Sequence, residues 1–112
     1  VLFRSDDAVI GATCHASLNA AEQAAQQGAT YLAFGRFFPS TTKPDASPAP
    51  LDILAAAKTR FELPVVAIGG INLDNAPQVI SAGADMIAAV DAVYNVPNIQ
   101  QICQQFQALF SV

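Results

Sequence analysis

Short apolar runs alternate with amphipathic stretches along the whole chain. The runs are four to six residues long and lie close to glycine or proline, which predicts buried strands, and the stretches between them have helical spacing. The predicted strands are 9–14, 31–34, 63–68 and 86–90. The predicted helices are 18–27, 51–59, one from Asn72 or Asp74 through Ser81, and one from Pro97-Asn98 through Phe110. The pattern therefore predicts (βα)₄.

Residues at the predicted helix ends agree with this order. Ser17 or Asn19 can cap the first helix, while Gly28 and Gly83 fit the position just after the first and third helices. There is also a weak internal repeat, because residues 27–30, before the second strand, resemble residues 82–85, before the fourth. A repeat of two β/α units is expected in a barrel, where successive units pack alike.

Alternating strands and helices predict a parallel sheet with right-handed crossovers. A doubly wound sheet would need about five strands and usually binds its ligand after the first, whereas a closed barrel takes about 250 residues. Here, residues suited to a ligand follow every strand, at Thr13, 40–43, Gly69-Gly70 and Val90-Asp91. This distribution favours a barrel mouth. We therefore expect one domain, 1–112, that is the carboxyl-terminal half of a TIM (β/α)₈ barrel, strands 5 to 8, with the first half missing.

Composition and charge limit the classes of function that are expected for this chain. The chain is 53% hydrophobic and only 12% charged, which predicts a part of a larger packed body. The net charge is −4 and the basic residues are scattered, so no nucleic-acid face is expected. No apolar run reaches the roughly 20 residues of a membrane span, and residues 1–5 do not read as a signal peptide. We expect a cytoplasmic protein without membrane or nucleic-acid partners.

The two cysteines, Cys14 and Cys103, are far apart and form no Cys-x-x-Cys or Cys/His cluster. This spacing predicts two reduced, packed thiols and no metal or redox site in this chain.

The most polar of the strand-end segments is the loop after residues 31–34. Between prolines at positions 39 and 44 it offers three hydroxyls and one ammonium group, from Ser40, Thr41, Thr42 and Lys43. Prolines stiffen such a loop, and hydroxyl and ammonium donors bind phosphate oxygens. The alternative interpretation is an ordinary surface loop rich in Ser, Thr and Pro.

Together, these segments resemble one family. The order and spacing of four segments are similar to those in thiamine phosphate synthase. The segments are residues 10–15 (IGATCH), 34–45 (FGRFFPSTTKPD), 67–71 (AIGGI) and 83–85 (GAD). The resemblance runs from about residue 9 to residue 93, and residues 1–5 match poorly. It implies a (β/α)₈ barrel enzyme that joins hydroxymethylpyrimidine diphosphate to thiazole phosphate with Mg²⁺. The products are thiamine phosphate and pyrophosphate.

The resemblance also implies a role for each matching residue. Thr13 and Lys43 would contact the pyrimidine diphosphate, and Lys43 would stabilise the charge of the leaving pyrophosphate. The thiazole phosphate would be held by Ser40, Thr41, Thr42, Gly70, Val90 and Asp91. Asp91 departs from the family, which often has Ser there, and a carboxylate would repel phosphate. The Mg²⁺ ligands are expected in the missing half, so the chain alone should be inactive in synthesis.

Two alternatives remain open at this point. The first is a thiazole tautomerase-like enzyme on the same fold, in which His15 would act on the thiazole. The second is a non-catalytic half-barrel that binds small phosphorylated molecules and self-associates through the exposed edges of its first and last strands.

Overall fold

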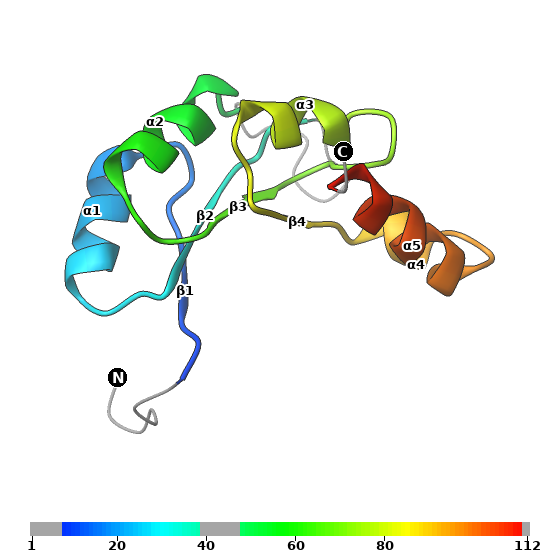
Figure 1. Cartoon of the computed structure of the whole chain (residues 1–112), viewed down its shortest axis with the longest axis horizontal. Coiled ribbons are helices and arrows are strands. Elements are labelled where there is room, and N and C mark those ends of the chain that lie inside the picture. The colour runs from blue at the N-terminus through cyan, green and yellow to red at the C-terminus, as the bar shows by residue number, and fades with distance from the viewer. Residues whose placement is uncertain (1–7, 39–47, 111–112) are drawn as a thin grey trace.

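The computed structural model describes residues 8–38 and 48–110, which form four β/α units around one sheet (Figure 1). The four strands are parallel and lie in chain order, β1-β2-β3-β4. The strands are β1 Gly11–Thr13, β2 Tyr31–Phe34, β3 Val65–Ile68 and β4 Met86–Ala88. The helices are α1 Leu18–Gln26, α2 Asp52–Arg60, α3 Ala76–Ala82, α4 Asp91–Tyr94 and α5 Ile99–Leu109. The predicted parallel (βα)₄ order is confirmed.

Several elements begin or end at other residues than predicted. β1 is shorter than predicted, and Val9 before it is 78% exposed. β4 ends at Ala88, because the chain turns into the short helix α4, which the sequence pattern did not predict. Helix α3 starts later than expected, because the Asn72 side chain accepts hydrogen bonds from the Asp74 and Asn75 N–H groups and closes a turn before the helix.

The two faces of the sheet have different surroundings. Register-paired residues of parallel strands point to the same face. One face packs against the helices and holds the core strand residues Leu32, Phe34, Val65 and Ala67. The opposite face, which we call the inner face, consists of uncharged residues: Gly11, Thr13, Tyr31, Ala33, Val66, Ile68, Met86 and Ala88. Ile68 is 39% and Met86 42% exposed, so the prediction of buried strands fails at the end of β3 and at the start of β4.

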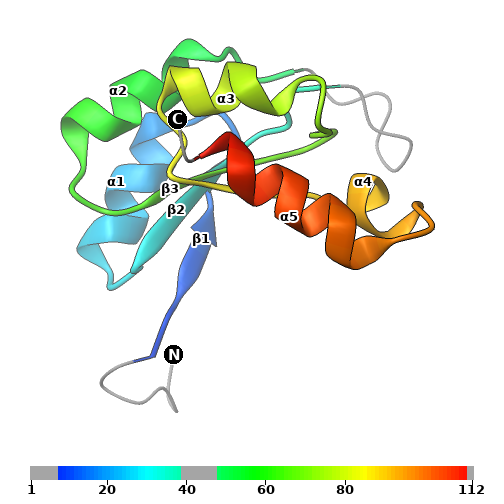
Figure 2. The same ribbon diagram turned by 45° about the vertical axis from the view of Figure 1, so that its right-hand side comes forward.

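The helices bury few of their side chains. Helix α2 buries Ile53, Leu54 and Ala57, while Ala55 is exposed. Helix α5 packs beside α3 and α4 (Figure 2) and buries Phe106. Cys103 is exposed, so the prediction of two packed thiols is wrong there, although both cysteines are free.

The internal repeat corresponds to a shared contact at the amino ends of the strands. Before β2, the Ile10 N–H donates to Thr30 Oγ1 at 2.7 Å, and the Thr30 N–H donates to Ile10 O. Before β4, the Val65 N–H donates to Asp85 Oδ2 at 2.8 Å, and the Asp85 N–H donates to Val65 O. In both repeats a polar side chain at the start of a strand therefore binds the backbone at the start of its neighbour.

β1 and β4 are the two edges of the described sheet, so each has one strand neighbour. Self-association through these edges stays a prediction.

Among the described residues, no helix combines the length and the apolar character needed to cross a membrane.

We expect the Asp85 contact to make stability depend on pH. Burial of the carboxyl is the largest single influence and acts to raise its pKa. The hydrogen bonds from Lys58 and the Val65 N–H, together with the Lys58 charge, outweigh burial, so the pKa of Asp85 is lowered. A lowered pKa adds stability above the unfolded value of about 3.9 and loses it as the pH falls through the folded value. Urea unfolding should therefore show Asp85→Asn less stable than the original chain at pH 7, with the difference shrinking as the pH falls through the lowered pKa of Asp85.

The exposed pair between Arg60 and Glu22 provides the matched control, because among the described residues no backbone N–H group donates to the Glu22 carboxylate. Glu22→Gln should change the free energy of unfolding at pH 7 by less than about 0.5 kcal/mol. Asp85→Ala also leaves the buried Val65 N–H without its acceptor and should cost roughly 1–3 kcal/mol. Equal effects of Glu22→Gln and Asp85→Ala would contradict this account.

Candidate functional site

The carboxyl ends of the four strands form one rim, which is the candidate site. Parallel strands in chain order place all their carboxyl ends at the same edge of the sheet, and neighbouring strands lie about 4.8 Å apart. The rim therefore spans about 14 Å from the end of β1 to the end of β4. Thr13 ends β1, Gly70 follows β3, and Val90 follows β4. The structure brings these three predicted site residues to the same edge.

Four predicted site residues lie outside the described residues: Ser40, Thr41, Thr42 and Lys43. The described residues on either side of this segment both contact the rim. The Phe38 N–H donates to Gly69 O at 3.2 Å, and the Ala49 N–H donates to Arg36 O at 2.6 Å. The described residues on both sides of this segment therefore lie near the ends of β2 and β3.

Two glycines allow β2 and β3 to approach closely at the rim. A Cβ atom on Gly35 would lie 2.1 Å from Ile68 O, and one on Gly69 would lie 2.7 Å from Arg36 Cα. Both distances are far shorter than side-chain atoms tolerate, so glycine is required for this contact. The close approach places the backbone of Arg36 directly against the Gly69-Gly70 turn.

The Gly69-Gly70 turn has a conformation that other residues rarely adopt. Gly69 has φ +106° and Gly70 has φ +70°. The turn does not open the next helix, because α3 begins only at Ala76. The Asn75 side-chain amide instead donates to Gly70 O at 3.0 Å and holds the turn. Any anion at this turn would therefore meet backbone and side-chain donors and not the end of the α3 dipole.

At the end of β1, the Thr13 hydroxyl and the Cys14 thiol differ in their exposure to solvent. Thr13 is exposed on the inner face, and His15, also exposed, has φ +51° and accepts a hydrogen bond from the Gly35 N–H at 3.1 Å through its carbonyl. Cys14 is buried, and burial raises the pKa of its thiol against the smaller, opposing effect of a backbone hydrogen bond at Ala33. The thiol therefore stays protonated near neutral pH and is not a nucleophile.

Val90 and Asp91 open the short helix α4 beyond β4. Val90 is 66% exposed and is the residue that precedes the helix, while Asp91 is in its first turn. The Asn95 side-chain amide lies 3.4 Å from Asp91 Oδ1. The two predicted positions are thus at the rim, and the carboxylate of Asp91 remains the feature least suited to phosphate.

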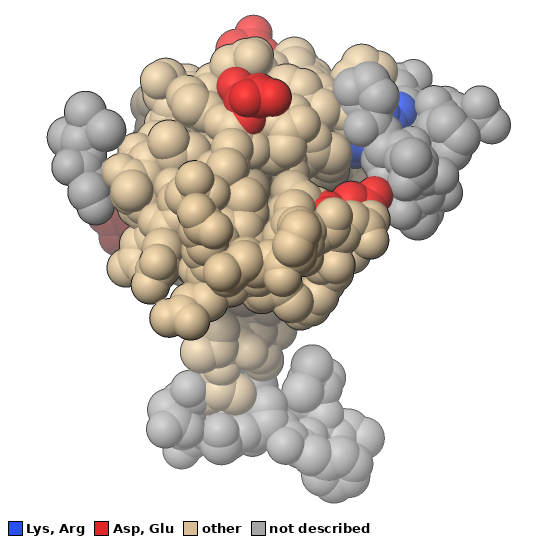
Figure 3. Space-filling view, turned by 90° about the vertical axis from the view of Figure 1, so that its right-hand side faces the viewer, with Lys and Arg blue, Asp and Glu red and all other residues tan. Residues whose placement is uncertain are grey.

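Arg36 is a residue at the rim to which the sequence assigned no role. Its Nη1 donates to Phe38 O at 2.9 Å, and its Nε is buried with no hydrogen-bond partner among the described residues. The sequence contains one signal that could have pointed to Arg36, because this arginine lies between a predicted strand end and a polar loop. On the face of the molecule that Figure 3 shows, the visible Lys and Arg atoms lie in one small area, and most of the described surface there is uncharged.

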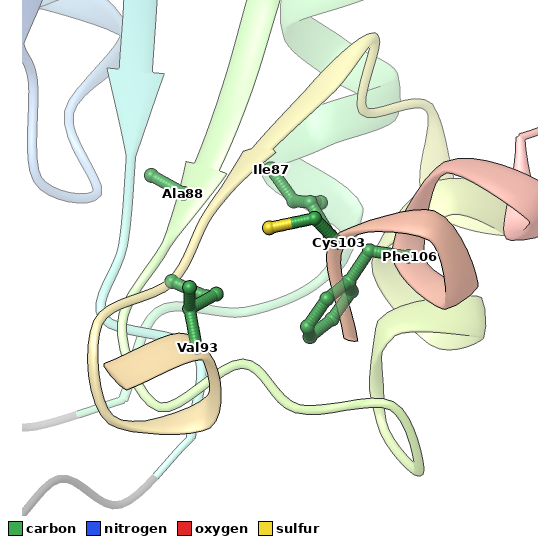
Figure 4. A pocket seen from close by; sticks show the side chains of 6 residues that line it. Ile87, Ala88, Val93, Cys103 and Phe106 are labelled. Carbon is green, nitrogen blue, oxygen red and sulfur yellow. The ribbon is translucent and has the colours of Figure 1, made fainter. Parts of the chain in front are cut away.

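The described residues also form an apolar pocket of about 330 Å³ between β4, α4 and α5 (Figure 4). Its lining is Ile87, Ala88, Ala89, Val93, Cys103 and Phe106. Such a lining offers no charged donor for a phosphate, so this pocket is not the anion site.

Residues 8–38 and 48–110 contain no group of three or more His, Cys, Asp or Glu side chains that could hold a metal ion. The described residues by themselves therefore do not form a site for Mg²⁺.

Four parallel β/α units, with polar residues and tight glycine turns at the carboxyl ends of the strands, define one half of a TIM-barrel protein. A model of the thiamine monophosphate synthase family matches residues 3–93. The chain belongs to this family.

Solved structures agree with this assignment. The thiamine phosphate pyrophosphorylase from Pyrococcus furiosus is 36% identical, with a TM-score of 0.80; the match covers 92% of this chain and 48% of that one. The present chain therefore spans about half the length of that relative. The (S)-3-O-geranylgeranylglyceryl phosphate synthase from Thermoplasma acidophilum is 22% identical with a TM-score of 0.66, covering 85% of this chain and 37% of that one. At that identity the likeness shows the fold alone.

We expect Gly35→Ala to destabilise the chain far more than Gly11→Ala. The new methyl group at Gly35 meets the carbonyl oxygen of Ile68, so relief needs movement of the backbone between β2 and β3. At Gly11 it meets the far end of the Tyr31 ring, 2.0 Å from Cζ, and that flexible side chain can turn away. Urea unfolding should show a loss of about 3 kcal/mol at Gly35 and about 1 kcal/mol or less at Gly11. Similar losses would contradict the close contact.

Proposed function

We propose that the protein to which this chain belongs is a thiamine phosphate synthase. It would join hydroxymethylpyrimidine diphosphate to thiazole phosphate and release pyrophosphate. The observation that supports this most is the rim, where Thr13, Gly70 and Val90 follow three strands of one parallel sheet in a chain of this family. Because the chain spans about half the length of its P. furiosus relative, the whole activity is proposed for the larger protein.

The substrate groups would be divided along the rim. Thr13 and Lys43 would bind the pyrimidine diphosphate, the first through its exposed hydroxyl and the second through its ammonium group. The thiazole phosphate would be bound nearer β3 and β4, by Ser40, Thr41, Thr42, Gly70, Val90 and Asp91. Phe38, the last described residue before this segment, donates a hydrogen bond to Gly69 O, which supports placing Lys43 close to the same rim.

Lys43 would act by electrostatics. When the bond between the pyrimidine methylene and the diphosphate breaks, the electron pair leaves with pyrophosphate, whose negative charge grows. A lysine and hydroxyl groups that already point at this charge stabilise it without having to reorganise. Mg²⁺, if bound by the larger protein, would neutralise part of the diphosphate charge. No covalent bond to the protein is needed.

Asp91 requires its own assignment, because its carboxylate would repel a phosphate. We infer that the backbone N–H groups of this short segment would face the substrate and that the carboxylate would not. Asp91→Ser, which introduces the residue common in the family, should then tighten or leave unchanged the binding of thiazole phosphate. A cytoplasmic location and the identity of the metal stay predictions.

The test joins this chain, in one polypeptide, to the part of the P. furiosus pyrophosphorylase that it does not match. We expect this fusion to form thiamine phosphate from the two phosphorylated substrates, measured by chromatography of the product. Lys43→Ala should lower the turnover number about 10²- to 10³-fold, the usual cost of removing one preorganised charge stabiliser. A folded fusion without any synthesis would contradict the proposal.

His15→Ala is the matched control on the same rim. We expect it to change the rate of synthesis less than about threefold, because the proposed chemistry needs no acid or base at this position. Loss of activity at His15 with full activity in Lys43→Ala would contradict the synthase assignment and favour the tautomerase-like alternative.

A further inference from the structure

Arg36 differs from the other basic residues that the structure describes. Lys58 pairs with Asp85, and Arg60 pairs with Glu22, both away from the rim. Within residues 8–38 and 48–110, no carboxylate forms an ion pair with the Arg36 guanidinium. Among the Lys and Arg residues in the described part of the chain, Arg36 is thus the one without an acidic partner.

The stem of this side chain lies across the glycine turn. The position of a Cβ atom on Gly69 is 2.7 Å from Arg36 Cα and 2.8 Å from both its Cβ and its Cγ. The guanidinium is fixed at one point, where Nη1 donates to Phe38 O, and the Phe38 N–H in turn donates to Gly69 O. This set of contacts holds the Arg36 side chain at the carboxyl end of β3, against Gly69.

The remaining donors of the guanidinium suit an anion. A guanidinium has five N–H groups, and the described residues accept from one of them. The residue is half-buried, so its charge is only partly solvated, and an unpaired, partly desolvated cation attracts a counter-ion strongly. The planar fork of arginine matches two oxygens of one phosphate group, which a lysine ammonium cannot do.

We propose that Arg36 is a further substrate-binding residue, which binds a phosphate group of the substrates beside the Gly69-Gly70 turn. The assignment rests on the proposed function, because it needs a phosphorylated ligand at this rim. It adds a second basic residue, on the described framework of the sheet, to the ammonium group of Lys43. The phosphate would then be bound from two sides, by the fork of Arg36 and by the donors of the turn.

The experiment measures the affinity of the 112-residue chain for inorganic pyrophosphate by isothermal titration calorimetry at constant ionic strength. Arg36→Gln removes the charge and should raise the Kd at least tenfold. Arg36→Lys keeps the charge but removes the fork and should raise the Kd by a smaller factor. Arg60→Gln is the matched control, because it removes the same charge from the last residue of α2, away from the rim, and it should leave the Kd unchanged.

Each outcome decides the assignment. A Kd of Arg36→Gln equal to that of the original chain would overturn it, and so would an equal loss in Arg60→Gln, which would indicate a response to total charge. Failure of the original chain to bind pyrophosphate would overturn the proposed phosphate rim and this assignment with it. Circular dichroism of the unliganded variants separates unfolding from lost binding, and Arg36→Lys keeps the test valid if Arg36→Gln does not fold.

Discussion

The close approach of β2 and β3 at their carboxyl ends is the constraint on which the site depends. The backbone of Gly35 lies against Ile68 O, and Gly69 lies against Arg36, with no room for a Cβ atom at either glycine. This contact fixes where the polar segment after β2 leaves the sheet relative to the Gly69-Gly70 turn. Thr13 and Val90, at the two outer strands, reach the same rim because all four strands are parallel.

The two ends of the sheet have different tasks. At the amino ends, the side chains of Thr30 and Asp85 bind backbone N–H groups of the neighbouring strands, so their donors and acceptors are used within the fold. At the carboxyl ends, the Thr13 side chain is exposed and Arg36 lacks a carboxylate partner among the described residues. This division between stability at one end and binding at the other is the general property of TIM barrels.

Local sequence signals predicted the order of elements but not what each one contacts. The strands are bounded by turn residues, and Ser17 and Asn98 accept the hydrogen bonds expected of helix caps, because capping depends on neighbours in sequence. The four-residue helix α4 has no side-chain cap and is too short to show a period. The exposure of Cys103 and the position of Arg36 over the glycine turn depend on packing between distant segments, which periodicity does not report.

Backbone amide chemical shifts of the ¹⁵N-labelled chain during a titration with inorganic pyrophosphate test the central claim most directly. If the carboxyl ends of the strands form one anion-binding rim, the largest shift changes will occur at Thr13, Gly35, Gly69, Gly70 and Val90. Residues at the amino ends, such as Thr30 and Asp85, will then change little. Changes confined to the amino ends, or none at the rim when pyrophosphate is in large excess, would contradict the claim.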